Sequence, residues 1–217
     1  MLKAHRLLSL ALLAAVLAHA APSSAETIID EWSSVKAPPP PELRVATVDP
    51  KTTALLVMDL LKQTCNTERR PRCVASLPKI AELIAAARAK GVMVVYTTLP
   101  NIPIADTVPA VAPKGDEPVV TAYVDKFILG NQDTGLEKVL KDKGITTVIT
   151  VGTAAHGAVL YTSSMAALRG FNVIVPVDGM SADGQNTYIE QYVAFNLTSA
   201  PVLSAKITLS RIDMIKF

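Results

Sequence analysis

Short apolar runs alternate along the chain with segments in which apolar residues recur every three or four positions. Continuous apolar runs are typical of strands buried on both faces, and they occur at residues 54–58, 92–97, 119–124, 146–151, 172–177 and 202–209. Helical spacing is found between them, at residues 77–90, 134–144, 154–168 and 186–198. Strands that alternate with helices predict an α/β fold, a three-layer, doubly wound, mainly parallel sheet.

The segment from Val148 to Leu160 predicts a binding turn. Its β-branched run meets a group of glycine and small residues, and a helical pattern begins immediately after them. A strand that ends at a helix N-terminus gathers unpaired N–H groups and the positive end of a helix dipole, which suits an oxyanion or a carboxylate. We expect a small-molecule ligand to contact this turn through Thr153, Ala154, Ala155, His156, Gly157 and Ala158.

Two charged residues follow predicted strands and are candidates for catalysis. Asp59 comes directly after the run at residues 54–58, and Lys126 comes shortly after the weaker run at residues 119–124. Ligands of parallel sheets bind beyond the carboxyl ends of the strands, so we expect both side chains and the His156 turn at that edge. Taken in isolation, Asp59 is more typical of a helix or turn cap and Lys126 of a solvated surface lysine, and His156 could simply cap the helix.

The first 25 residues are typical of a secretory signal peptide. Lys3 and Arg6 precede an apolar stretch too short to span a bilayer, and small residues suitable for cleavage follow at Ala20 and Ala25. We therefore expect a periplasmic or secreted protein with no membrane attachment after cleavage. Residues 26–50, which include four consecutive prolines, predict an extended N-terminal arm, and residues 51–217 predict one domain.

The charge balance argues against nucleic acid as a partner. The full chain has 21 Lys and Arg residues and 19 Asp and Glu residues, and loss of Lys3 and Arg6 with the signal peptide makes the two equal. No basic surplus is left to neutralise phosphates. Metal and cofactor sites are not expected either, because His156 would be the one histidine remaining and no acidic cluster has ligand spacing.

The two cysteines, Cys65 and Cys73, favour a disulfide. They are eight positions apart in a segment that contains arginines and a proline, and an oxidising compartment would pair them. A reactive thiol at Cys65 is the alternative interpretation.

Three separated motifs together resemble the isochorismatase-like (cysteine hydrolase) superfamily. They are Leu55–Asp59, Val124–Phe127 and Ile149–Gly152, and the likeness continues through Met165–Val173 to Asp178. The resemblance implies a Rossmann-like fold and an active site with an Asp, a Lys and a Cys nucleophile. Asp59 and Lys126 match the first two, but Ala158 stands at the place of the cysteine and cannot form a covalent intermediate.

The turn is also similar to that of the isochorismatases proper, which carry an Ala-His pair there and, as the resemblance implies, cleave an enol ether with a general-acid Asp. The leading hypothesis is an exported non-thiol hydrolase of a small molecule, in which Asp59 donates a proton and Lys126 stabilises charge. The alternatives are a catalytically inactive binding protein of the same fold and a thiol hydrolase that uses Cys65. The family likeness and the Pro-rich loop at residues 100–118 suggest a homo-oligomer.

Overall fold

The computed structural model describes residues 27–184 and 187–217, and the predicted signal peptide lies outside them. The described residues belong to two units, one that ends at Pro38 and one that runs from Pro39 to Phe217. In the described part of the first unit, the short helix α1 (Ile28–Glu31) begins after Thr27, whose backbone N–H donates to the Asp30 carboxylate at 2.8 Å. In the second unit, residues before position 50 already pair with the rest of the domain, because β1 (Ala46–Thr47) lies parallel to β11 (Ile215–Lys216).

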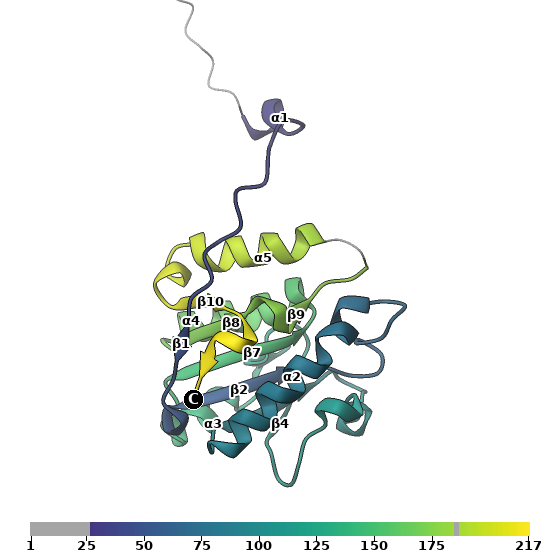
Figure 1. The fold of residues 1–217 in the computed structure, drawn as a ribbon, viewed down its shortest axis with the longest axis vertical. Coiled ribbons are helices and arrows are strands. Elements are labelled where there is room, and N and C mark those ends of the chain that lie inside the picture. The colour runs from purple at the N-terminus through teal and green to yellow at the C-terminus, as the bar shows by residue number, and fades with distance from the viewer. Residues whose placement is uncertain (1–26, 185–186) are drawn as a thin grey trace, which may run out of the picture. The chain divides into compact units, whose positions relative to one another are not determined.

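The second unit is built on a seven-stranded sheet in which every strand pair is parallel (Figure 1). The strand order is β10-β8-β7-β2-β3-β4, and β9 pairs with the end of β7. The strands are β2 (Thr53–Met58), β3 (Met93–Thr98), β4 (Val119–Thr121), β7 (Thr147–Thr153), β8 (Asn172–Pro176), β9 (Met180–Ser181) and β10 (Ile207–Ser210). The predicted parallel α/β fold is therefore confirmed.

Helices cover both faces of this sheet (Figure 1). They are α2 (Pro71–Ala89), α3 (Leu136–Asp142), α4 (Leu160–Leu168) and α5 (Thr187–Ser199). Short 3₁₀ segments connect the elements at Pro50–Thr52, Ile104–Asp106, Pro109–Val111, Val177–Gly179, Leu203–Ala205 and Ile212–Met214. A small hairpin is formed by β5 (Ile128–Leu129) and β6 (Gln132–Asp133).

The central strand β2 divides the core into two layers. Successive side chains of a strand point to opposite faces. Leu56 and Met58 accordingly pack with residues of α3, α4 and α5, whereas Leu55 and Val57 pack with residues of α2. All six residues of β2 are buried, as expected for a strand covered on both sides.

The start of α3 differs from the helical segment predicted at residues 134–144. Thr134 and Glu137 fit a capping box, yet Gly135 is the N-cap residue and adopts a left-handed conformation with φ 82°. This places Thr134 one position too early to cap the helix in that way. Its hydroxyl instead donates to the backbone carbonyl of Lys126 at 2.7 Å and accepts from the N–H of Leu136 at 3.3 Å. Thr134 thus helps to hold the segment that carries Lys126.

Candidate active site

Asp59 lies at the carboxyl end of β2, where the backbone leaves the sheet. Its φ of 51° is left-handed, a conformation that Asp tolerates better than most residues. The hydroxyl of Thr97, at the end of β3, donates to Asp59 Oδ1 at 2.6 Å and accepts from the Asp59 N–H at 3.2 Å. Only 3% of Asp59 is exposed. The carboxylate is therefore fixed by a neighbouring strand and screened from water.

Lys126 points at the same carboxylate from the loop after β4. Its Nζ lies 2.7 Å from Asp59 Oδ2, and no part of the lysine is exposed. The other two N–H groups donate to the carbonyls of Ala122 at 3.0 Å and Tyr123 at 2.5 Å. An ammonium group has three donors, and all three have acceptors here, so the geometry suits the charged lysine.

Contacts with α4 hold the backbone of Lys126. Its N–H donates to the Thr162 hydroxyl at 3.2 Å, and that hydroxyl donates to the carbonyl of Val124 at 3.2 Å. The helix that follows the predicted binding turn therefore positions the lysine that reaches Asp59. Asp59 and Lys126, 67 positions apart in the sequence, thus meet because the end of β2, the loop after β4 and α4 pack together.

Burial and the neighbouring charges shift the pKa values of Asp59 and Lys126 in opposite directions. Burial raises the pKa of Asp59 above its ordinary value, while Lys126, Thr97 and Arg70 oppose that rise. Burial lowers the pKa of Lys126, and Asp59 opposes that fall. A carboxyl group with a raised pKa is suited to hold a proton and to release it to a ligand.

The predicted turn follows β7 and begins next to the end of β2. Gly152 pairs with Met58, and a Cβ atom on this glycine would lie 2.0 Å from the Met58 carbonyl oxygen. The Thr153–Ala154 peptide bond is cis. Residues Ala155–Val159 then form a turn that is kinked at Gly157, whose φ of −117° and ψ of −107° are not helical, and that leads directly into α4.

The side chains of this turn differ in exposure. Ala155 and Ala158 are buried and pack in the same apolar cluster as Met58 and Phe127, the neighbours of the catalytic candidates. His156 is exposed, and within residues 27–184 and 187–217 it makes no hydrogen bond or ion pair. The N–H of Gly157 donates to the carbonyl of Ala154 at 3.0 Å, so this amide of the predicted oxyanion-binding group already has an acceptor.

Cys65 and Cys73 form a disulfide, which confirms the sequence prediction. Both sulfur atoms are engaged in this bond, so Cys65 has no thiolate to act as a nucleophile. The disulfide therefore contradicts the hypothesis of a thiol hydrolase based on Cys65.

Sequence reasoning missed three residues around Asp59. Thr97 binds its carboxylate, and the hydroxyl of Thr64 donates to its backbone carbonyl. Arg70 contributes a nearby positive charge that lowers the pKa of Asp59. The position of Thr97 could have been found from strand alignment, because Met58 pairs with Thr97, but no local pattern marks Thr64 or Arg70.

Between residues 27–184 and 187–217, His, Cys, Asp and Glu side chains do not gather into a group of three or more that could hold a metal ion. In the same part of the chain, no helix combines the length and the apolar character needed to cross a membrane.

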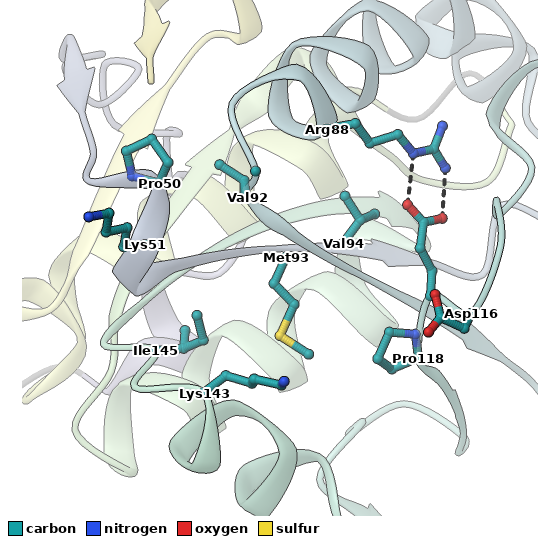
Figure 2. Close-up of a pocket in the computed structure, with 12 residues that line it drawn as sticks. Pro50, Lys51, Arg88, Val92, Met93, Val94, Asp116, Pro118, Lys143 and Ile145 are labelled. Atoms are coloured by element: carbon teal, nitrogen blue, oxygen red, sulfur yellow. Dashed lines mark hydrogen bonds and ion pairs between the residues drawn. The ribbon is translucent and has the colours of Figure 1, made fainter.

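A separate cavity of about 500 Å³ lies at the opposite edge of the sheet (Figure 2). It is lined by residues at the amino ends of β2 and β3, including Lys51 and Met93. Arg88 and Glu117 form one wall through two charge-assisted hydrogen bonds of 2.7 Å each. None of the predicted site residues lines this cavity, and ligands of parallel sheets bind at the other edge.

Comparison with known proteins identifies the family. The isochorismatase domain model matches residues 53–206, which is most of the chain. This chain belongs to the isochorismatase family. Its match with a protein named secreted isochorismatase effector Isc1, from Verticillium dahliae, has 33% identity over 116 residues, or 49% of this chain. The match spans only 60% of the length of that relative.

Solved isochorismatase-family structures share the fold. An isochorismatase family protein from Burkholderia thailandensis superposes with a TM-score of 0.63 at 22% identity, over 79% of this chain and 96% of that one. A cysteine hydrolase from Pseudomonas syringae pv. phaseolicola superposes with a TM-score of 0.67 at 20% identity, over 80% and 94% of the two chains. These likenesses show the isochorismatase-like α/β fold, and at such low identity they do not carry a substrate.

Proposed function

We propose that this isochorismatase-family protein is an exported hydrolase that acts on a small molecule without a thiol nucleophile. The observation that carries the proposal is the contact of 2.7 Å between Lys126 Nζ and Asp59 Oδ2, buried at the carboxyl edge of the sheet. Ala158 stands where the resemblance to cysteine hydrolases implies a nucleophile, and it offers no group that could attack a substrate. Acid-base chemistry by Asp59 is the chemistry left to this site.

In the proposed reaction, protonated Asp59 donates its proton to the substrate. The resulting carboxylate is stabilised by the Lys126 ammonium and by the Thr97 hydroxyl. A water molecule adds to the carbon made electron-poor by protonation, and loss of a proton from that water restores the acid. One water is consumed, and no covalent enzyme intermediate is formed. The turn at residues 153–158 would contact the substrate.

Export is supported by two features of this chain and one of a relative. The first 25 residues have the pattern of a signal peptide, and the disulfide requires an oxidising environment to persist. The relative from Verticillium dahliae is named as secreted. Fractionation of the producing cells should place the protein outside the cytoplasm, with an N-terminus at residue 21 or 26 by mass spectrometry. A cytoplasmic protein that retains Met1 would contradict export.

The catalytic proposal is tested with a panel of small enol ethers, esters and amides. We expect turnover of at least one class, and we expect Asp59→Asn to reduce it by about 100-fold or more, because the variant cannot donate the proton. Asp106→Asn is a matched control, since Asp106 pairs with Lys62 and has no contact with the Asp59–Lys126 pair. Turnover that survives Asp59→Asn would disprove the acid role.

The alternative is a binding protein of the same fold, favoured by the absence of a nucleophile at Ala158. It predicts that a ligand raises the melting temperature without being consumed, and that Asp59→Asn leaves this shift unchanged. Ala158→Cys provides a further distinction. Amidase activity gained by this variant would indicate that Asp59 and Lys126 are still arranged for the chemistry of the thiol members.

A further inference from the structure

We propose that Arg70 is a positioning residue of the candidate active site, a second cation that the disulfide loop holds near Asp59. The inference deepens the proposed function and rests on it, because it concerns the same acid. The disulfide loop is the segment from Cys65 to Cys73 that the bond closes.

Arg70 is buried in a place that its own helix does not favour. It is the N-cap residue of α2, where the positive end of the helix dipole repels a cation. Arg69 and Arg72 lie beside it and add to the positive charge. Only 4% of Arg70 is exposed, and an arginine is almost never buried to this extent unless it is paired, as it is here with Asp183. A role in local helix stability therefore does not explain its position.

Hydrogen bonds connect Arg70 to Asp59 through Thr64. Arg70 Nη1 donates to the backbone carbonyl of Thr64 at 2.7 Å, and the Thr64 hydroxyl donates to the backbone carbonyl of Asp59. The Arg70 Nε is buried and has no hydrogen bond partner in the described part of the chain.

The disulfide loop and the β9–α5 segment hold the guanidinium in this place. The backbone N–H of Arg70 donates to the backbone carbonyl of Asn66 at 2.8 Å, and the backbone N–H of Cys73 donates to the backbone carbonyl of Arg70 at 3.0 Å. Arg70 Nη2 lies 2.5 Å from Asp183 Oδ1. A second ion pair, between Arg72 and Glu190 of α5 at 2.9 Å, also joins the disulfide loop to the β9–α5 segment.

The charged groups near the acid can therefore be named. Lys126 contacts the Asp59 carboxylate directly, and Arg70 exerts a smaller charge effect on it. Asp125 acts on Lys126, while Asp183 and Arg69 act on Arg70. Lys126 and Arg70 both lower the pKa of Asp59, against the burial that raises it. Arg70 thus acts through Asp59, by keeping its proton exchangeable despite burial.

The test reads Asp59 directly and needs no substrate. The side-chain carboxyl ¹³C resonance of Asp59 is assigned by its absence from Asp59→Asn and titrated by NMR in the full folded protein. Arg70→Gln should raise the midpoint, because a nearby cation that lowers the pKa of Asp59 is lost. Arg70→Lys keeps the charge and should stay much closer to the unsubstituted protein.

Arg69→Gln is the matched control. Arg69 is an adjacent arginine that pairs with the same Asp183 carboxylate at 3.4 Å, but it does not act on the pKa of Asp59. Its substitution should leave the midpoint unchanged. An equal midpoint in Arg70→Gln and the unsubstituted protein, or an equal rise in Arg69→Gln, would overturn the proposal.

If Arg70→Gln fails to fold, a second variant tests the same proposal. The double variant Cys65→Ser/Cys73→Ser opens the loop and keeps every charge, so the midpoint should rise toward the value expected without Arg70. Faster amide exchange at residues 66–70 with an unchanged midpoint would show a purely structural loop and refute the inference. Because neither readout depends on turnover, a failed substrate search leaves this test intact.

Discussion

Removing the ammonium group of Lys126 should destabilise the fold strongly, and by an amount that depends on pH. Lys126→Met keeps most of the side-chain length and removes the charge. The substitution leaves the Asp59 carboxylate, of which 4% is exposed, without its cation, and it also removes the donor to the Ala122 and Tyr123 carbonyls. Removing one partner of a buried ion pair typically costs about 3–5 kcal/mol. We expect a loss of free energy of unfolding in that range at pH 8.

The loss should be smaller at pH 5. Without Lys126, burial raises the folded-state pKa of Asp59 further above its value in the unfolded chain. A raised folded-state pKa gives stability that is present at low pH and is lost as the pH rises through that pKa. Protonation at low pH removes the buried charge, so the deficit of the variant should increase from pH 5 to pH 8.

Urea denaturation at the two pH values measures this effect. Lys138→Met is the control, because Lys138 forms an exposed ion pair with Asp142 on one helix turn, and such pairs contribute below about 1 kcal/mol. Asp59→Asn/Lys126→Met should be less destabilised at pH 8 than Lys126→Met alone, since it leaves no buried charge. A cost of Lys126→Met below about 1 kcal/mol at pH 8, or an equal cost at both pH values, would refute the reasoning.

Three further predictions concern other parts of the fold. Gly152→Ala should lower the free energy of unfolding by about 2–5 kcal/mol, measured by thermal unfolding, because Gly152 has φ 133° and a Cβ atom would lie 2.0 Å from the Met58 carbonyl oxygen. Gly170→Ala is the control and should cost less, because the space around Gly170 is open. Reduction of the Cys65–Cys73 disulfide should lower the free energy of unfolding by about 2–3 kcal/mol, and no change on reduction would contradict this. Burial raises the pKa of Tyr96 to about 12, so the unsubstituted protein should lose about 2–3 kcal/mol between pH 10 and 12, and Tyr96→Phe should not show this loss. The difference in tyrosinate absorbance between the two proteins checks the ionisation of Tyr96, and a midpoint near 10 would disprove it.

The sequence alone determined the layers of the fold and the edge of the sheet where the candidate site lies. Continuous apolar runs such as Leu55–Met58 can be buried only between two layers of helices, and parallel strands place the residues after them at one edge. Asp59 and Lys126 each follow such a strand, so the sequence predicts both at the same edge. The cysteines likewise predicted the disulfide, because the chain has only two of them and they are eight positions apart.

Only the tertiary structure decided how the acid is surrounded. The left-handed conformation of Gly135 prevented the capping box and turned Thr134 toward Lys126 instead. The exposure of His156 and the position of Arg70 depend on contacts between segments distant in sequence, such as Arg70 with Asp183. Local spacing carries no information about such contacts, because they form only when the loops after separate strands pack together at the edge of the sheet.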